Sequence, residues 1–339
     1  MKLKLDDIAQ KAGVSVATVS RVLNNKSTSD KTRSIVEKTI ADLHYKPKLS
    51  NRVILNDKSF RIGVIVSNME NPYYSSIMSS MEITLREKGY LCNFASSGKR
   101  GGEEIDILGR FIDSGVDGLI IVDVGNKEEN SGLYSDLNRL IPVVLINGNP
   151  DRMDSNLILV DQTQGMNETM DYFFKLNHER IAFIRGSSKY FSFECKEQVY
   201  IEKMNEKNYP LEPNSIINID DTDHFDCIDF TSNRLIDILK SKDRPTAIFA
   251  CNELMGLGVL KAAREVGLSI PKDLSLIAHD NTVLSQISVP KMTTVDLNPS
   301  RLGLEAAEMM LQLLNSKIRR PRRLTFYSEL LIRGSTLSI

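Results

Sequence analysis

One arginine near the N-terminus has a side chain and a setting that suit the reading of DNA bases. Arg21 carries a guanidinium group that can donate two hydrogen bonds to O6 and N7 of a guanine. It lies on a predicted helix that follows Gly13 and Ser15. A glycine can take the positive φ of a tight turn, and a serine can cap the helix after it. A helix, a glycine turn and a second helix are the form of a DNA-reading helix-turn-helix motif.

The spacing of apolar residues predicts three short helices in this region. The first has its apolar positions at i, i+3, i+4 and i+7, and the second presents its apolar residues on a different face from Arg21. Ser29 is a plausible N-cap for the third. The alternative is an ordinary small helical domain with no DNA partner. The apolar positions of the three helices are, in order, Leu5, Ile8, Ala9 and Ala12; Val19, Val22 and Leu23; and Ile35, Val36, Ile40 and Leu43.

Charge is unevenly distributed along the 339 residues. The chain has a net charge of −1, but residues 1–58 hold twelve Lys and Arg against six Asp and Glu. A small basic segment on an acidic body fits contact with phosphates. No apolar run approaches the ~20 residues of a membrane span, and the N-terminus does not resemble a signal peptide, so we expect a cytoplasmic protein.

Beyond residue 60, buried apolar runs alternate with helical patterns. Continuous Val, Ile and Leu runs separated by helices indicate parallel sheets built from βαβ units. The runs are too many for one sheet, so we predict two α/β lobes. The expected strands are 62–66, 91–95, 119–122, 143–146, 157–160, 181–184, 216–219, 247–250 and 274–278.

The C-terminal segment is expected to return to both lobes. We assign about 61–158 and 293–320 to the first lobe, and about 160–289 and 323–339 to the second. The elements of the tail are a strand at 293–295, a helix near 300–315 and a strand pair near 323–333.

No catalytic or metal-binding pattern stands out. The sequence has no GxGxxG after a strand, no P-loop and no GxSxG. The four histidines, at 44, 178, 224 and 279, lack metal-ligand spacing, and the four cysteines, at 92, 195, 227 and 251, contain no CxxC pair. We therefore expect no cofactor, no metal and no enzymatic activity.

The residue strings of the N-terminal helices closely resemble the headpiece of the LacI/GalR family of bacterial transcription regulators. These are Asp7-Ile8-Ala9, Gly13-Val14-Ser15 and the run from Ala17 to Asn24. The resemblance continues through the core, in the same order and spacing. It rests there on Asn71-Pro72-Tyr73-Tyr74, Val116-Asp117-Gly118, His178-Glu179-Arg180, Pro245-Thr246-Ala247, Asn252-Glu253, Ile270-Pro271-Lys272-Asp273, Asp280-Asn281 and Glu329 to Thr336.

The resemblance implies which residues meet DNA. Val16, Ala17 and Arg21 would contact base edges, the first two through thymine methyl groups. A second set would position the headpiece on phosphate and sugar. That set is Ser15, Thr18, Asn24, Thr32 and Tyr45.

The family places a hinge after the headpiece, and in this chain that is residues 48–59. It is expected to fold on the operator and to wedge an apolar side chain into the minor groove. Arg52 fits the family pattern, and Ile54 stands where leucine is usual, followed by Leu55. Two β-branched residues lower the helix propensity here. A plain flexible linker is the alternative.

The resemblance also implies an effector site in the cleft between the lobes, outside the carboxyl ends of the parallel strands. A lysine replaces the usual arginine at position 196, so a point charge stands in place of a planar fork. Aromatic faces, a carboxylate and a cation suit a sugar or another small polar metabolite. The implied contacts are Tyr73, Tyr74, Lys196, Phe225 and Asp280.

The expected fold class is α/β, with a three-helix helix-turn-helix headpiece at 1–47, the hinge at 48–59, and a two-lobed periplasmic-binding-protein-like core with parallel sheets at 60–339. We expect a sequence-specific transcriptional regulator, with a repressor as the first choice. Its expected partners are a near-palindromic operator and a small effector. The chain stops at Ile339 without a leucine-heptad helix, so a homodimer is expected. A solute-binding receptor and a sugar-converting enzyme are the alternatives.

Overall fold

The computed structural model divides the chain into two units, Met1–Phe60 and Arg61–Ile339. Most of the predicted hinge lies outside the residues that the structure describes. In that described part, none of the helices has the length and apolar character needed to cross a membrane. The described residues are 5–23, 28–43, 58–98, 103–123, 131–150, 155–186, 190–220, 224–316 and 320–339.

The N-terminal unit contains three helices around a small apolar core. They are α1 (Leu5–Ala12), α2 (Val16–Leu23) and α3 (Asp30–Asp42). One expected core residue is not buried, because the Ile35 side chain is 41% exposed. α3 instead buries the face that carries Val36 and Thr39, and the Thr39 hydroxyl donates to the carbonyl oxygen of Ile35 at 2.8 Å. The buried residues are Ile8, Ala9, Val19, Val22 and Val36.

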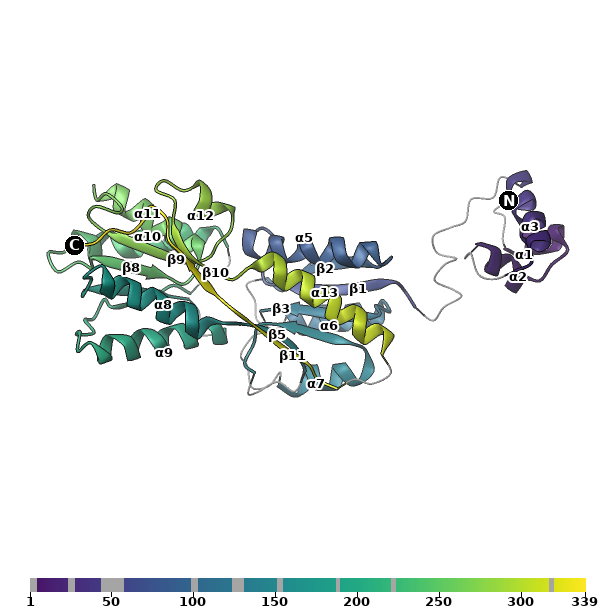
Figure 1. Cartoon of the computed structure of the whole chain (residues 1–339), viewed down its shortest axis with the longest axis horizontal. Coiled ribbons are helices and arrows are strands. Elements are labelled where there is room, and N and C mark those ends of the chain that lie inside the picture. Colours follow the sequence, from purple (N-terminus) through teal and green to yellow (C-terminus); the bar gives the residue numbers. More distant parts are fainter. Residues whose placement is uncertain are drawn as a thin grey trace. The chain divides into compact units, whose positions relative to one another are not determined.

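The second unit contains two six-stranded sheets, as expected of a two-lobed α/β core (Figure 1). The first sheet has the strand order β11-β5-β4-β3-β1-β2, and all its pairs are parallel. Its strands are β1 (Arg61–Val66), β2 (Leu91–Ser96), β3 (Gly118–Val122), β4 (Val143–Ile146), β5 (Asn156–Asp161) and β11 (Arg323–Tyr327).

Helices cover both faces of the first sheet. α5 (Pro72–Glu87) packs side by side with α13 (Pro299–Asn315) on one face, as Figure 1 shows. α6 (Glu103–Asp113) and α7 (Ser131–Leu140) contribute Leu108 and Tyr134 to the core on the other face. Because both faces are covered, β1, β3 and β4 are continuous apolar runs rather than alternating ones.

The second sheet has the strand order β12-β10-β9-β8-β6-β7, and only its β10–β12 pair is antiparallel. Its strands are β6 (Ile181–Arg185), β7 (Ile216–Asn218), β8 (Ala247–Ala250), β9 (Ser275–Asp280), β10 (Thr293–Asp296) and β12 (Glu329–Leu331). Its helices are α8 (Gln162–Lys175), α9 (Phe191–Glu206), α10 (Asp226–Lys240), α11 (Glu253–Glu265) and α12 (Val283–Ile287).

The expected assignment of the C-terminal strands to the lobes is wrong. β10 pairs with β9 in the second sheet, with Thr293 opposite Ile277, although 293–320 was assigned to the first lobe. β11 pairs with β5 in the first sheet, although 323–339 was assigned to the second. Only α13 and β12 lie in the expected lobes. Both sheets offer an open edge to these short strands, so an apolar pattern cannot tell which edge each strand joins.

The chain therefore passes between the lobes three times. The passages follow β5, β10 and β11, and the predicted strand pair near 323–333 is two strands in different sheets. The yellow C-terminal segment in Figure 1 runs from one sheet to the other. These three connections join the two lobes, and the lobes can move relative to each other about them.

Candidate functional site

Gly13 and Ser15, the two residues predicted from the sequence, form the turn of the helix-turn-helix and the start of its second helix. Gly13 has φ +66°, the left-handed conformation that ends α1 and begins the turn. The Ser15 side-chain oxygen accepts from the backbone N–H of Thr18 at 3.2 Å, which caps the first turn of α2. The Ser29 side chain makes the equivalent bond to the Thr32 N–H at 3.3 Å before α3.

The residues predicted to read bases lie on the exposed face of α2. The Val16 side chain is 37% exposed, and Ala17 and Arg21 are also exposed. Val19 and Val22 on the opposite face are buried in the core of the headpiece. α2 therefore presents two apolar residues and one guanidinium outward, which is the chemistry that base recognition in a major groove needs. Five predicted DNA contacts, Asn24, Tyr45, Arg52, Ile54 and Leu55, lie outside the described residues.

Four of the five predicted effector residues line one cavity between the lobes, which we call the inner cavity. Tyr73 and Tyr74 come from the first lobe, and Lys196 and Asp280 from the second. The fifth, Phe225, directly precedes α10, and its 44% exposed side chain is not part of this lining. The other lining residues are Asn71, Asp123, Asn147, Gln162, Tyr190, Ser192, Phe193, Cys251, Asn252 and Leu297.

The inner cavity lies at the carboxyl ends of parallel strands, where open α/β sheets bind ligands. Asp123, Asn147 and Asp280 end or directly follow β3, β4 and β9, and all three have positive φ, at 54°, 55° and 104°. Non-glycine residues rarely adopt this conformation, and such strain concentrates at binding sites. Asp123 and Asn147 were missed from the sequence, although their place after buried strands is a signal that could have found them.

The first-lobe side of the inner cavity is a hydrogen-bonded array. Asn71 caps α5 by accepting from the Tyr73 N–H at 3.0 Å, and Pro72 occupies the first turn, where a missing N–H costs nothing. The Asn147 amide donates to the Tyr73 hydroxyl at 3.0 Å and to Asp123 Oδ1 at 2.7 Å. The Tyr73 and Tyr74 rings meet edge to face, with centroids 5.2 Å apart. These contacts hold Tyr73 in one orientation before any ligand arrives.

Lys196 supplies the ammonium group that lines the inner cavity. The residue lies on α9 and is 2% exposed. Its Nζ donates to the carbonyl oxygen of Cys251 at 3.2 Å and lies 5.1 Å from the centre of the Phe193 ring. A buried cation is costly unless it is paired, and these two contacts offset part of that cost. The remaining N–H groups of the ammonium can serve a ligand.

Asp280 is the acidic counterpart of Lys196. Burial raises the pKa of its carboxyl group to about 8, and the neighbouring Glu253 carboxylate adds to the increase while Lys196 opposes it. Burial also raises the pKa of Glu253, whose carboxylate accepts from the Thr282 N–H at 2.7 Å. A carboxyl group that titrates near neutrality can either donate or accept a hydrogen bond.

His279 does not form an acid–base pair with the adjacent Asp280. Successive residues of a strand point to opposite faces of a sheet, and His279 packs edge to face on Phe249, with ring centroids 5.1 Å apart. Burial lowers the pKa of His279 well below its usual range, so the ring is neutral. Neither ring nitrogen has a hydrogen-bond partner among the described residues. This side chain belongs to the core of the second lobe.

One hydrogen bond spans the two lobes beside the inner cavity. The Ser67 hydroxyl, just after β1, lies 2.8 Å from the hydroxyl of Tyr190, just before α9. Both groups are buried. The inner cavity beside them measures about 40 Å³, which is room for roughly three water molecules at ~10–15 Å³ each. The lobes are thus closed on each other in this structure.

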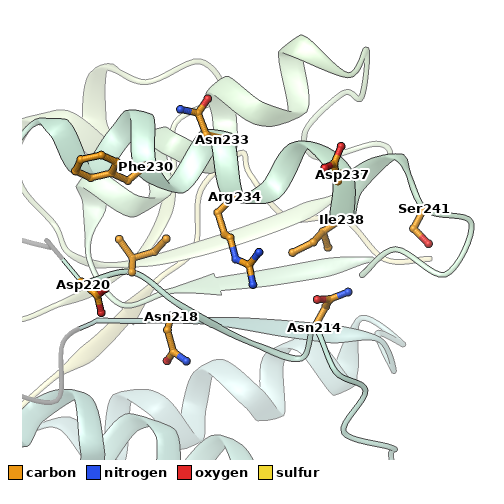
Figure 2. A pocket seen from close by; sticks show the side chains of 10 residues that line it. Asn214, Asn218, Asp220, Phe230, Asn233, Arg234, Asp237, Ile238 and Ser241 are labelled. Atoms are coloured by element: carbon orange, nitrogen blue, oxygen red, sulfur yellow. The ribbon is translucent and has the colours of Figure 1, made fainter.

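A larger groove of about 720 Å³ lies on the second lobe alone, between α10 and the edge strand β7. Figure 2 shows Arg234 extending from α10 toward the segment that carries Asn214 and Asn218. None of the five predicted effector residues lines this groove. A ligand bound there would touch one lobe only, so it would not bridge the two lobes.

Comparisons with known proteins agree with both units. A model described as "Bacterial regulatory proteins, lacI family" matches residues 4–48, and one described as "Periplasmic binding protein-like domain" matches residues 170–336. The HTH-type transcriptional repressor PurR of Histophilus somni (strain 129Pt) is 29% identical over 341 residues, which cover 99% of this chain and 99% of that relative.

Two solved structures share the fold over nearly the whole chain. The lac repressor dimer bound to operator and the anti-inducer ONPF has a TM-score of 0.86 and 23% identity, covering 99% of this chain and 100% of that one. The transcriptional regulator CelR–cellobiose complex has a TM-score of 0.70 and 24% identity, covering 98% and 99%. Both likenesses concern the arrangement of helices and strands.

Proposed function

Since this chain belongs to the LacI family of bacterial regulatory proteins, we propose that a small polar metabolite bound between the lobes of its core controls its affinity for operator DNA. It is a DNA-binding transcriptional regulator of the repressor type rather than an enzyme. The observation that carries the proposal is the convergence of Tyr73, Tyr74, Lys196 and Asp280, from both lobes, on one cavity.

The headpiece reads DNA through α2. Arg21 donates to a guanine, and Val16 and Ala17 contact thymine methyl groups in the major groove. Ser15, Thr18 and Thr32, with Asn24 and Tyr45, hold the headpiece on the phosphates. Arg52 and an apolar wedge from Ile54 or Leu55 act in the minor groove. Because its target is chromosomal DNA, the regulator works in the cytoplasm.

The effector is a neutral polar molecule, and a sugar or sugar derivative is the first choice. The lining holds the ammonium group of Lys196 and the carboxyl group of Asp123, which are of opposite charge, so a charged ligand gains little net attraction from them. Asn147 and Asn252 add amide groups to the lining, and the tyrosine rings offer faces for stacking. The structural neighbour CelR is in complex with cellobiose, while the name of the relative PurR makes nucleobases the second class to test.

The lobes couple the cavity to DNA. A ligand shifts the DNA equilibrium only by its different affinity for the open and closed arrangements of the lobes. The Ser67–Tyr190 hydrogen bond favours the closed arrangement, and a ligand that places a group larger than 40 Å³ in the inner cavity changes the spacing of the hydroxyls that make this bond. The first lobes of a dimer then transmit the change to the paired hinges and headpieces.

The dimer forms through exposed apolar residues of the core. Val283, Ile287 and Val289 lie on and after α12 and are 55%, 68% and 91% exposed, and Ile83 on α5 is 46% exposed. A monomer seldom leaves such a group in water without a reason. A single headpiece reads a half-site only, so a two-fold dimer matches a near-palindromic operator.

Fluorescence anisotropy of a labelled DNA fragment from upstream of this protein's own gene tests the proposal. The titration is made at one stated salt concentration, because phosphate contacts dominate the affinity for DNA. The titration is repeated with sugars, sugar phosphates and nucleobases. We expect one compound to change the dissociation constant for DNA, and Asp280→Ala to abolish that change while DNA binding without ligand persists. A normal response in Asp280→Ala would place the effector elsewhere.

A further inference from the structure

A second cavity adjoins the inner cavity between the lobes, and the effector contacts described above do not use it. This outer chamber measures about 460 Å³. It shares Asn147, Gln162 and Ser192 with the inner cavity, so these three residues lie at the boundary of both spaces. First-lobe residues of the β4, β5 and β11 segments line one side of it. The N-terminal turns of α8 and α9 line the other.

The two spaces differ about tenfold in volume. Ligand cavities for small metabolites and drugs measure about 300–1,000 Å³. The outer chamber falls in this range, while the inner cavity holds only a few water-sized groups. With the lobes closed, the body of a ligand therefore fits the outer chamber, and only a small projecting group fits the inner cavity.

Gln162 lies at the junction of the two spaces and has an unsatisfied hydrogen-bond acceptor. The residue is 7% exposed and is the first residue of α8. Its side-chain Oε1 is buried and has no hydrogen-bond partner among the described residues. Native proteins rarely leave a buried polar atom unpaired without a function. The position calls for an O–H or N–H donor from a ligand.

The chamber's other side chains favour an uncharged ring. Leu159, Pro150 and Phe191 offer apolar surface against which a ring face can lie. The lining also holds one carboxylate and one guanidinium, Asp161 and Arg323, whose charges balance. The Asp161 carboxylate already accepts from the Thr163 N–H at 2.8 Å to cap α8. This balance favours a neutral ligand over a sugar phosphate.

We infer that the outer chamber binds the body of an uncharged glycoside, a ring linked to a second ring, which donates a hydrogen bond to Gln162 Oε1. The molecule's other end then reaches toward Lys196 and Asp280 in the inner cavity. Disaccharides and nucleosides share this chemistry. The inference rests on the proposed function for the identity of the inner site, and it adds the size class of the effector.

Calorimetry on the full chain measures the binding affinity of each test compound. Cellobiose and adenosine are the two glycosides, and glucose and adenine are the corresponding single rings. We expect one glycoside to bind at least ~10-fold more tightly than its own single ring, because two adjoining spaces are filled. Cellobiose and adenosine distinguish the two sources of the glycoside. Equal affinities for ring and glycoside, or binding of none of the four, would overturn the inference.

Two substitutions locate the contacts. Gln162→Met keeps the side-chain length and removes the acceptor, and we expect ~10-fold weaker binding of the glycoside. Gln164→Met is the matched control, because Gln164 bonds Glu168 on the exposed face of the same helix. Thr325→Trp fills the outer chamber from β11 and should abolish glycoside binding, whereas Thr325→Ser should not.

Failure of this inference differs from failure of the proposed function. If a compound changes DNA affinity equally in wild type, Gln162→Met and Thr325→Trp, the effector does not use the outer chamber, although the regulator is effector-controlled. If a glycoside binds through Gln162 and the affinity for DNA does not change, the outer chamber is a binding site, and the proposed control of DNA binding by the ligand is wrong. Far-ultraviolet circular dichroism of each variant verifies that it is folded.

Discussion

Ser67 and Tyr190 are separated by 123 positions in the chain, and their hydroxyl oxygens lie 2.8 Å apart across the cleft between the lobes. Each hydroxyl is held by its own lobe, one after β1 and the other before α9. Because the bond joins the lobes directly, its strength enters the equilibrium between the closed and open cores. A buried hydrogen bond contributes about 0.5–1.5 kcal/mol net, enough to shift such an equilibrium several-fold.

Tyr190→Phe should shift the core toward the open arrangement. The substitution removes the cross-lobe bond and leaves the ring contact with Phe193. We expect small-angle X-ray scattering to report a larger radius of gyration than for the wild type. Tyr172→Phe is the matched control, because that hydroxyl contacts Thr336 within the second lobe. Identical scattering from Tyr190→Phe and the wild type would show that the bond does not hold the lobes together.

Asp280→Asn should change how stability depends on pH. The pKa of Asp280 is raised from 3.8 to about 8, so the native protein keeps a proton here that the unfolded chain releases above about pH 4. The free energy of unfolding therefore falls as pH rises from about 4 to about 8, and asparagine removes this contribution. Differential scanning calorimetry from about pH 5 to about pH 8 should give a steeper decrease in Tm for the wild type.

Asp296 on the neighbouring strand supplies the control, because its carboxylate bonds the Asn298 N–H outside the cavity. Asp296→Asn controls for the exchange of a carboxyl group for an amide outside the cavity. Parallel curves for the wild type and Asp280→Asn would contradict a protonated Asp280 in the folded protein.

Arg21→Ala should reduce the preference for operator over random DNA. Two hydrogen bonds to a guanine provide about 1–3 kcal/mol of discrimination, or roughly 5- to 150-fold. Arg33→Ala on α3 is the comparison, since Arg33 is paired with Glu37 at 3.9 Å and should affect both DNAs alike. Anisotropy with operator and scrambled duplexes at one salt concentration measures the ratio. An unchanged ratio in Arg21→Ala would mean that α2 does not enter the groove in the proposed way.

Gly303→Ala should destabilise the core. A Cβ at this position would lie 2.1 Å from the carbonyl oxygen of Ile77, where α13 packs on α5. Backbone must shift to relieve this contact, and overpacking of that kind costs about 1–3 kcal/mol. Gly109→Ala in α6 meets no atom within 4 Å and should instead stabilise by about 0.5–1 kcal/mol. Urea unfolding curves measure both, and similar midpoints for the two variants would refute the close-packing argument.

The local sequence carried enough information for the helices, the strands and the helix-turn-helix. Gly13 and Ser15 act within a few residues of their partners, so turn and capping chemistry predicts them directly. Runs such as 119–122 and 143–146 are buried on both faces, and their apolar pattern is strong enough to place each strand. The residue strings of the headpiece also predicted which side chains of α2 are exposed.

Only the tertiary structure decided where distant segments meet. It placed β10 and β11 in the opposite lobes from those expected, because backbone pairing at a sheet edge depends on which edge is open and not on residue type. It also brought Asn147 to Tyr73 and Ser67 to Tyr190, and left Phe225 outside the inner cavity. Local propensities act over one or two turns of chain, whereas a binding cavity is made by strand ends that only the packing of whole sheets brings together.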